Sequence, residues 1–282
     1  PTILPLTKRF ADWDLAIMRS SWDADATMTT FKCSPIGGHQ LKDIWRATYP
    51  GSGHAHPDAN SFTLFAAGQW LIADAGATMT KYSRNHNTLL VNQGGQLGEG
   101  QRWLDGNVQL RDDCKPGIVF TESGAEYDYF VGDASDLYAA SAGLKRFLRH
   151  FVYVRPNTVI ILDELEAKAP VTFDWLFHSP GSIVSNSNAC AEIHDADTRM
   201  RMAWTGPIQT TPTIGVVPVE AEYPDKDWSR LNVLNLNQTG TADTWLATAM
   251  VAENGKTHDI TFVQPSPGRL EVSVQSETRS IR

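Results

Sequence analysis

Apolar and polar residues alternate in short runs along most of the chain, which is the pattern of half-buried β-strands. The runs are rich in Val, Ile, Thr and aromatic residues, and Gly, Pro, Asn or Asp bound most of them. We expect strands at residues 15–19, 28–32, 43–48, 62–66, 70–74, 88–92, 108–111, 118–121, 146–155, 158–163, 171–178, 199–204, 233–236, 245–251, 260–263 and 270–274.

Helical periodicity is scarce in this sequence. Residues 126–139 are the one stretch with room for a helical turn or two. The break at 155–158, Arg-Pro-Asn-Thr, separates two apolar runs and predicts a hairpin turn, because Pro sets the backbone for the corner. We therefore predict an all-β fold, a multi-stranded antiparallel β-sandwich or supersandwich.

The length of 282 residues suits one large core or two moderate ones. A polar run at 182–196 and a Lys-Ala-Pro corner at 168–170 are the candidate boundaries. We expect a first β-sandwich unit over residues 1–180 and a second β-sheet portion over 181–282. One continuous domain is the alternative.

Composition removes some classes of function. The net charge of −8 argues against a nucleic-acid partner, whose affinity comes largely from Lys and Arg on phosphates. It leaves an acidic polysaccharide open, since a basic cleft can lie on an acidic protein. The sequence contains no apolar run long enough for a membrane span, and we expect no membrane partner. The start at Pro1, without a signal pattern, indicates a piece of a longer parent.

The three cysteines, Cys33, Cys114 and Cys190, are far apart and fit no zinc-knuckle spacing, so we interpret them as buried small residues. Four of the tryptophans, Trp70, Trp103, Trp175 and Trp204, are interpreted mainly as core residues. The basic residues at 145–150, Arg149 included, are interpreted as a solvated strand face, with contact to an anionic polymer as the alternative. His178 is expected to be a hydrogen-bonded edge residue.

Residues 51–92 concentrate the chemistry of the chain, with three of its eight histidines and two carboxylates. If residues 54–64 are extended, even-numbered side chains share one face. The turn at 66–69 then returns the chain so that Asp74 lies near Asn60. His56 and Asp74 can meet only if the chain bends back at Pro57-Asp58, which is good turn chemistry.

His56, Asp74 and His86 form a set of two imidazoles and one carboxylate. Such a set suits Zn²⁺ with a fourth position left to water, and it suits other first-row ions as well. The spacing is long and irregular, so the competing interpretation is that each histidine is a hydrogen-bonded core or surface residue. For the pair in His54-Ala55-His56 we weigh the two interpretations equally.

Several blocks of this stretch resemble the heparinase II/III-like family of polysaccharide lyases. They are Gly53-His54-Ala55-His56-Pro57-Asp58-Ala59-Asn60-Ser61-Phe62, Gly68, Asp74-Ala75-Gly76, and Tyr82 followed by Arg84-Asn85-His86-Asn87-Thr88. Residues 129–135 and the hairpin at 149–163 are similar to the β-sandwich of the same family. The resemblance covers roughly residues 10–180.

The resemblance implies a β-sandwich that follows an N-terminal α/α toroid, in an enzyme that cleaves uronate-containing polysaccharides by β-elimination. It implies a zinc ion held by His56, Asp74 and His86, with His54 facing the substrate cleft. Tyr82 is the candidate for a second cleft residue, although it lies closer to His86 than the family pattern has it. The toroid supplies further catalytic residues in the family, and no counterpart of it is recognised in these 282 residues. The chain is therefore expected to be a C-terminal piece of a longer lyase, inactive alone, with a chain that has lost catalysis as the alternative.

The chemistry of elimination agrees with these residue types. A base removes the proton alpha to the uronate carboxyl group and an acid protonates the leaving oxygen, roles that His54 and Tyr82 can fill. Arg84 and Asn60 are the predicted substrate contacts, because their donors can neutralise the carboxylate. An ion pair at a strand edge is the alternative for Arg84. For Asn60, with Asp58, the alternatives are orienting a histidine and capping the turn.

We therefore predict part of a polysaccharide lyase acting on a glycosaminoglycan or alginate type of polymer. Its expected partners are Zn²⁺, the anionic polysaccharide, the toroid of the parent protein and, as an option, a second copy in a homo-oligomer. The substrate class implies a periplasmic or secreted protein. The alternatives are a non-catalytic carbohydrate-binding module and a zinc-dependent hydrolase.

Overall fold

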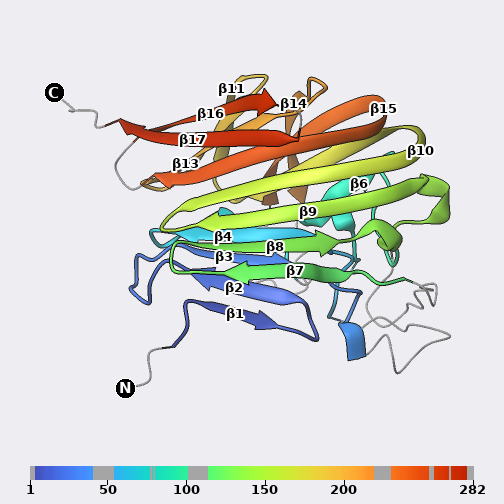
Figure 1. The fold of residues 1–282 in the computed structure, drawn as a ribbon, viewed down its shortest axis with the longest axis horizontal. Coiled ribbons are helices and arrows are strands. Elements are labelled where there is room, and N and C mark those ends of the chain that lie inside the picture. Colours follow the sequence, from blue (N-terminus) through green and yellow to red (C-terminus); the bar gives the residue numbers. More distant parts are fainter. Residues whose placement is uncertain are drawn as a thin grey trace.

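The computed structural model describes residues 4–40, 54–76, 78, 80–100, 114–218, 230–253, 257–266 and 268–277. Antiparallel strands make up most of these residues and form two large sheets and a hairpin (Figure 1). The predicted all-β class is confirmed. In the described residues no helix is long and apolar enough to cross a membrane. The strands predicted at 43–48 and 108–111, and Trp103, lie outside the described residues.

The first sheet has five strands that follow one another in chain order. They are β1 (Thr7–Phe10), β2 (Leu15–Arg19), β3 (Met28–Lys32), β4 (Ser61–Ala66) and β5 (Gln69–Ile72). In β2 and β3 every second residue is buried, because alternate side chains of a strand point to opposite faces of the sheet. The sequence pattern predicted four of these five strands and missed β1, whose four residues include three polar ones.

The second sheet has ten strands, with the order β11-β12-β13-β15-β10-β9-β8-β7 along its main path, while β14 pairs with β15 and β6 with β10. The strands are β6 (Leu89–Val91), β7 (Gly117–Ser123), β8 (Tyr127–Asp133), β9 (Leu144–Val154), β10 (Thr158–Ser179), β11 (Ser182–Ser187), β12 (Cys190–Asp195), β13 (Thr198–Thr205), β14 (Thr211–Pro218) and β15 (Arg230–Glu253). A separate hairpin, β16 (Thr257–Ser266) and β17 (Arg269–Glu277), follows.

Two strands are far longer than the pattern predicted. β10 joins the runs predicted at 158–163 and 171–178, and β15 joins those at 233–236 and 245–251. The Lys-Ala-Pro corner at 168–170 is an exposed irregularity inside β10, where the register shifts. Pro170 has no N–H to donate, so it is tolerated where the ladder is already interrupted.

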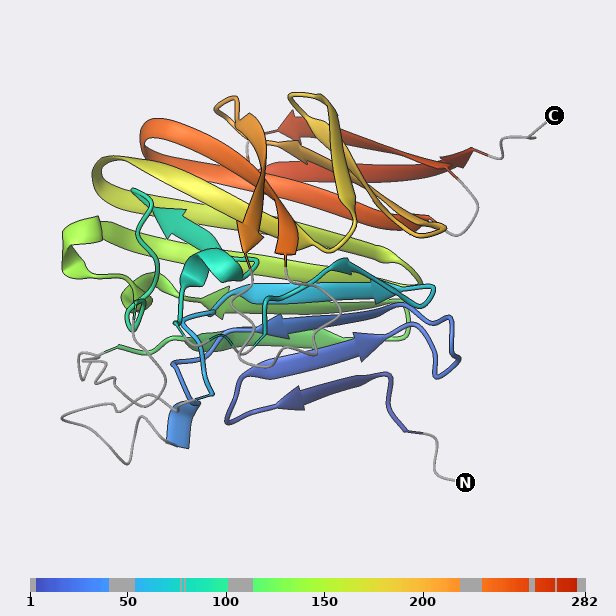
Figure 2. The same cartoon turned by 180° about the vertical axis from the view of Figure 1, so that it is seen from behind.

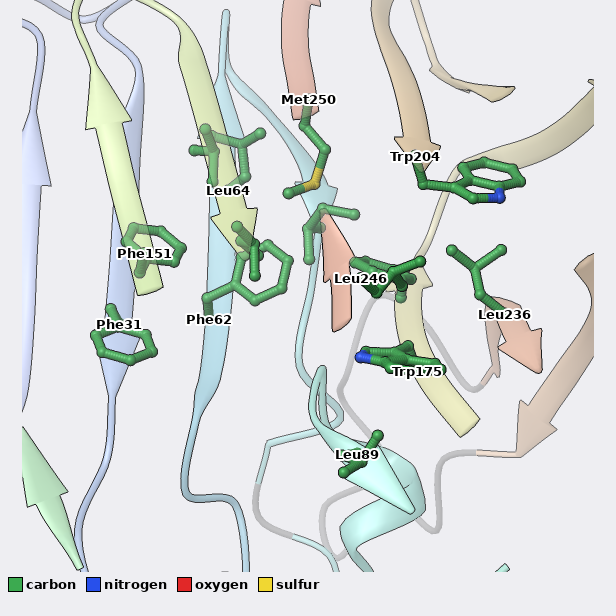
Figure 3. Close-up of a cluster of buried hydrophobic side chains, with 14 of the residues drawn as sticks. Phe31, Phe62, Leu64, Leu89, Phe151, Trp175, Trp204, Leu236, Leu246 and Met250 are labelled. Atoms are coloured by element: carbon green, nitrogen blue, oxygen red, sulfur yellow. The ribbon is translucent and has the colours of Figure 1, made fainter. Parts of the chain in front are cut away.

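The two sheets pack face to face over one hydrophobic core (Figure 3). Phe31 of β3 stacks on Phe151 of β9, with ring centroids 4.9 Å apart, and Phe62 of β4 lies 6.2 Å from Phe177 of β10. Trp175 and Trp204 are core residues, as predicted. The same core and the pairing of β10 with β15 continue across residue 180. The division into 1–180 and 181–282 stays a prediction.

The polar run at 182–196 and the stretch 126–139 are both strand-rich. The polar run forms the β11–β12 hairpin at the end of the large sheet. Residues 126–139 hold β8 and one 3₁₀ turn, η2 (Ser135–Leu137), and the similar turn η3 (Ala140–Ala142) follows. These strands and β14 were not predicted from the sequence pattern, although β8 and β14 carry aromatic and β-branched residues.

The interpretation of Arg149 as part of a solvated face is wrong. Its side chain is 1% exposed and forms a two-pronged ion pair with Asp163 of β10, at 2.8 and 2.7 Å. The remaining donor Nη1 contacts the carbonyl oxygens of Asn60 (2.5 Å) and Asn87 (2.9 Å). A buried arginine is stable only when its donors are paired, and here they hold the two loops of the candidate site onto the large sheet.

Candidate functional site

The chain bends back directly after His56. The N–H of Asp58 donates to the carbonyl of His56 (3.0 Å), the N–H of Ser61 donates to the carbonyl of Asp58 (3.2 Å), and Asn60 has a φ of 56°. Residues 54–60 therefore form a turn and not the extended run that we expected. The even-numbered side chains do not share one face, but the bend required to bring His56 to Asp74 is present.

A second loop is fastened onto this turn. The 3₁₀ turn η1 (Ser83–Asn85) starts with Ser83, whose hydroxyl donates to the carbonyl of Pro57 (2.7 Å) and accepts the N–H of Gln96 (2.8 Å). Gln96 in turn bonds both the N–H and the carbonyl of Ala59, at 2.9 and 2.8 Å. Figure 2 shows this part of the chain, with β6, in front of the large sheet.

The glycine-rich loop at 94–100 is part of the same assembly. A Cβ atom on Gly95 would lie 2.5 Å from Cβ of Ser83 and 1.8 Å from Glu99 Oε2. Glu99 accepts the N–H of Ser83 (3.1 Å). Glycine is needed here because the loop must approach η1 closely, so the loop is a packed support next to the site.

The three predicted metal ligands come together around His86. Its Nδ1 lies 2.6 Å from Oδ2 of Asp74, and its Nε2 lies 3.2 Å from Nδ1 of His56. The N–H of Thr78 points at Nε2 of His56 (3.4 Å), and the N–H of Gly76 donates to Oδ1 of Asp74 (2.7 Å). His56 and His86 are buried, whereas the Asp74 side chain keeps 26% of its surface exposed.

These contacts fix the protonation of the group. Burial, together with the neighbouring His86, lowers the pKa of His56 to about 4. Burial would lower the pKa of His86, but the Asp74 carboxylate raises it above its usual value. Burial would likewise raise the pKa of Asp74, but His86 holds it below its usual range. A neutral His56 and an ionised Asp74 are the forms in which these groups bind metals, whereas the raised pKa of His86 favours its protonated form, which must lose a proton before it can bind one.

Asn87 connects the site to both sheets. Its amide group donates to the carbonyls of Phe62 (2.9 Å) and Ala73 (2.7 Å), and its Oδ1 accepts the N–H of His178 (2.7 Å). His178 is fully buried, bonds the carbonyl of Arg84 through Nε2 (2.9 Å), and has its pKa lowered to about 4 by burial. The predicted hydrogen bonds of His178 are present, but the prediction of an edge residue is wrong, because His178 is buried on β10, a strand that lies between β9 and β15 in the sheet order.

A fourth possible ligand lies next to the predicted three. Donor atoms of Asp58, Asp74 and His86 all lie within 4.8 Å of one another. Asp58 is engaged by Lys32, whose Nζ lies 2.6 Å from Oδ1. His56 is outside this group of three, since among the donor atoms of Asp74 and His86 it contacts only Nε2 of His86.

The donor chemistry fits a zinc ion. Two imidazole nitrogens on one tetrahedral zinc lie roughly 3.3 Å apart when each bond is about 2.05 Å long. The 3.2 Å between His56 Nδ1 and His86 Nε2 matches this separation. Asp74 contacts the other nitrogen of the His86 ring, a position in which it sets the tautomer and supports ligation.

The residues predicted to face a substrate divide into two groups. His54 and Arg84 are exposed, Tyr82 is half-buried, and the Arg84 guanidinium lies over the Tyr82 ring at 4.0 Å from its centroid. Asn60 is fully buried, and its amide group donates to the carbonyls of Gly132 (3.2 Å) and Phe147 (3.4 Å). Because its side chain faces the large sheet, the prediction of Asn60 as a substrate contact is wrong.

The supporting residues Ser83, Gln96 and Arg149 were not recognised in the sequence as parts of the site, and Asn87 was noted only as a member of the Arg84–Thr88 block, without a role. Each acts on backbone groups far away in the chain, so the local sequence does not reveal what it does. Arg149 alone left a signal, since it alternates with the apolar residues Phe147 and Phe151 and so belongs to their inward face.

Comparisons with known proteins agree with this architecture. A family model described as heparinase II/III-like, C-terminal, matches residues 2–222. Among solved structures, the heparan sulfate lyase HepC from Pedobacter heparinus aligns with a TM-score of 0.73 at 16% identity, covering 97% of this chain and 41% of that one. A heparinase III structure aligns with a TM-score of 0.68 at 15% identity, covering 98% of this chain and 42% of that one.

Proposed function

The chain belongs to the heparinase II/III-like family, through its C-terminal domain, and on that premise we propose that it is the β-sandwich part of a polysaccharide lyase. The chain spans about two fifths of the length of the lyase structures it resembles. The proposed substrate is a uronate-containing polysaccharide of the glycosaminoglycan or alginate type. The proposed partner in catalysis is an N-terminal α/α toroid of the parent protein, and a polymer of this kind would place the protein in the periplasm or outside the cell.

The observation that carries the proposal is the way two segments are held together. The Ser83–Pro57 hydrogen bond and the His56–His86 contact tie the loop at 82–86 to the turn at 54–57. Both segments therefore present their exposed side chains from one rigid support. His54 and Arg84 are the exposed side chains and Tyr82 is half-buried beneath Arg84, and together they supply the residue types that an elimination requires.

The proposed roles follow the chemistry. One group of the His54 and Tyr82 pair takes the proton from the carbon next to the uronate carboxyl group, and the other gives a proton to the leaving glycosidic oxygen. The electron pair of the broken C–H bond forms the new C=C bond as the C–O bond to the leaving sugar breaks. Arg84 contacts the carboxylate, whose developing charge the guanidinium stabilises.

We predicted zinc at His56, Asp74 and His86; in this geometry an ion between His56 and His86, with Asp74 bonded to the far nitrogen of His86, would hold the turn and the loop together. In this proposal the metal is structural, and it would contribute folding free energy at the base of the site. If the protein were a hydrolase, the same ion would activate water directly, and a chelator would stop the reaction at once. A lyase with a structural zinc should lose thermal stability under a chelator before it loses activity.

Product analysis tests the proposal. The parent protein is incubated with heparan sulfate and with alginate, and the near-ultraviolet absorbance of a 4,5-unsaturated uronate is followed over time. We expect the absorbance to rise, and His54→Ala to abolish the rise while leaving the fold intact. His194→Ala is the matched control, since His194 is 34% exposed and pairs only with Glu192 among the described residues. Chain cleavage without this absorbance would establish a hydrolase, and binding without cleavage a carbohydrate-binding module.

A further inference from the structure

The outer face of the ten-stranded sheet carries a hollow that none of the site residues line. It has a volume of about 250 Å³ and lies where the β16–β17 hairpin approaches β9, β10 and β15. Figure 1 shows these strands, with the hairpin along the upper edge of the sheet. Arg146 and Arg149 of β9 point to opposite faces, so the hollow and the candidate metal site lie on opposite sides of the large sheet.

An aromatic ring forms part of the wall of this hollow. Trp245 of β15 is half-buried, and its Cα partner across the ladder is Glu164 of β10. Asp243, Gln264 and Arg269 add polar groups around the ring, and Arg269 also pairs with Glu271. A flat indole surrounded by carboxylate, amide and guanidinium groups suits a sugar ring, which offers C–H bonds on its face and hydroxyl groups on its edge.

Arg146 brings a donor without an acceptor into the same wall. Its Nε atom is buried and forms no hydrogen bond. The nearest carboxylate oxygens, on Glu164 and Glu166, lie 3.9 and 4.0 Å from guanidinium nitrogens, beyond hydrogen-bond distance. Each glutamate has another partner, His150 Nε2 at 3.2 Å and Lys145 Nζ at 2.9 Å. The Arg146 side chain as a whole is 41% exposed, so a rotation of its guanidinium would bring this donor to an incoming carboxylate or sulfate oxygen.

A strip of rings continues from the hollow across the sheet. The Tyr129 hydroxyl lies 2.7 Å from His150 Nδ1, the two rings stack with centroids 6.0 Å apart, and Phe120 lies 5.1 Å beyond Tyr129. His150 then contacts Glu164 at the hollow. The five adjacent strands from β7 to β15, spaced about 4.8 Å apart, span about 19 Å. That length suits a short run of linked sugars.

We propose that the hollow at Trp245 and the strip formed by Phe120, Tyr129 and His150 are a second saccharide-binding site. Its ligand is a segment of an acidic polysaccharide, with one sugar ring against Trp245 and an acidic group on Arg146. The identity of the saccharide rests on the proposed function, whereas the site itself does not use the metal or the catalytic residues. A site on this face would bind one segment of the polymer while another segment of the same polymer lies in the cleft.

Calorimetric titration of this chain with a heparan sulfate hexasaccharide and with neutral cellohexaose tests the site. We expect Trp245→Ala to raise the Kd for the acidic hexasaccharide by about tenfold or more, and Trp245→Tyr to keep most of the affinity because it keeps a ring. The matched control is Trp22→Ala, since Trp22 is 51% exposed and lies away from this sheet face.

The acidic contact has its own pair of variants. Arg146→Gln should weaken binding of the heparan sulfate hexasaccharide and leave cellohexaose unchanged. Arg199→Gln is the matched control, because Arg199 is 46% exposed and has a similarly long ion pair of 4.0 Å with Glu253. Equal effects of Arg146→Gln and Arg199→Gln would overturn the acidic contact.

Two results would overturn the whole site. The first is that the native chain does not bind the hexasaccharide. The second is that both Trp245 variants bind it with wild-type affinity while His54→Ala alone loses affinity. The near-ultraviolet product assay on the parent separates this failure from failure of the proposed function. A parent that produces unsaturated uronate while Trp245→Ala binds normally keeps its lyase function and loses only the second site. Loss of hexasaccharide affinity in Trp245→Ala supports the second site whether or not product is formed.

Discussion

The Nδ1 atom of His56 lies 3.2 Å from the Nε2 atom of His86, and the two rings meet edge to face with centroids 5.0 Å apart. The residues are 30 positions apart in the chain, and both are buried. One proton can lie between these two nitrogens, and a cation can replace it. This relationship makes His56 and His86 the core of the candidate metal site, while Asp74, on the opposite nitrogen of the His86 ring, orients that ligand.

Removal of single ligands should identify the metal-binding set. We expect the native chain to hold one zinc per molecule by elemental analysis after dialysis. His56→Ala should lose it, while Asp58→Asn should retain it with an affinity lowered at most about 10- to 100-fold, the range for residues that only orient a ligand. The reverse result, with zinc lost in Asp58→Asn and kept in His56→Ala, would make Asp58, Asp74 and His86 the ligands.

Loss of the buried Arg149–Asp163 pair should lower the stability of the folded protein. Arg149→Met leaves Asp163 buried without its cation, and we expect the free energy of unfolding to fall by about 3–5 kcal/mol. Urea denaturation followed by tryptophan fluorescence measures this change. Lys145→Met breaks an exposed ion pair with Glu166, and we expect it to lower the free energy of unfolding by less than about 1 kcal/mol. Similar midpoints for the two variants would refute a structural role for the buried pair.

A methyl group on Gly132 should disturb the candidate site from the opposite sheet. A Cβ atom there would lie 2.0 Å from Oδ1 of Asn60 and 2.8 Å from the Phe31 ring. We expect Gly132→Ala to destabilise the fold by about 1–3 kcal/mol through overpacking and to weaken zinc binding through the displaced turn. In Gly124→Ala the new atom would meet only the Tyr127 carbonyl, at 3.6 Å, so wild-type stability is expected. Thermal unfolding of both variants checks the comparison.

The cysteines should differ sharply in reactivity. Cys33 is fully buried, donates to the carbonyl of Asp133, and has its pKa raised far above the usual value by burial. Cys190 is half-buried on the outer part of the large sheet. We expect iodoacetamide at pH 8 to label Cys190 in the native protein and Cys33 only after unfolding, because the thiolate is the reactive form. Peptide mass spectrometry measures the order, and early labelling of Cys33 would contradict the described packing.

The amino-acid sequence by itself determined the class of fold and most of its strands. Alternation of apolar and polar residues depends only on the two-residue period of a strand, so β2 and β3 were predicted with their observed bounds. The resemblance also named the three residues that surround the candidate metal position, because histidines and an aspartate in that order are carried by the chain itself.

Only the tertiary structure decided which groups support and surround that position. Asn87 and Arg149 act on backbone atoms 14 to 91 residues away, and Asn60 turned out to face the large sheet instead of the substrate. Such contacts depend on how two sheets are stacked and on where a turn lies, which no local period encodes. The hollow at Trp245 is another such case, since its walls come from β9, β10, β15, β16 and β17, whose lining residues run from Arg146 to Leu270 and come together only in the folded protein.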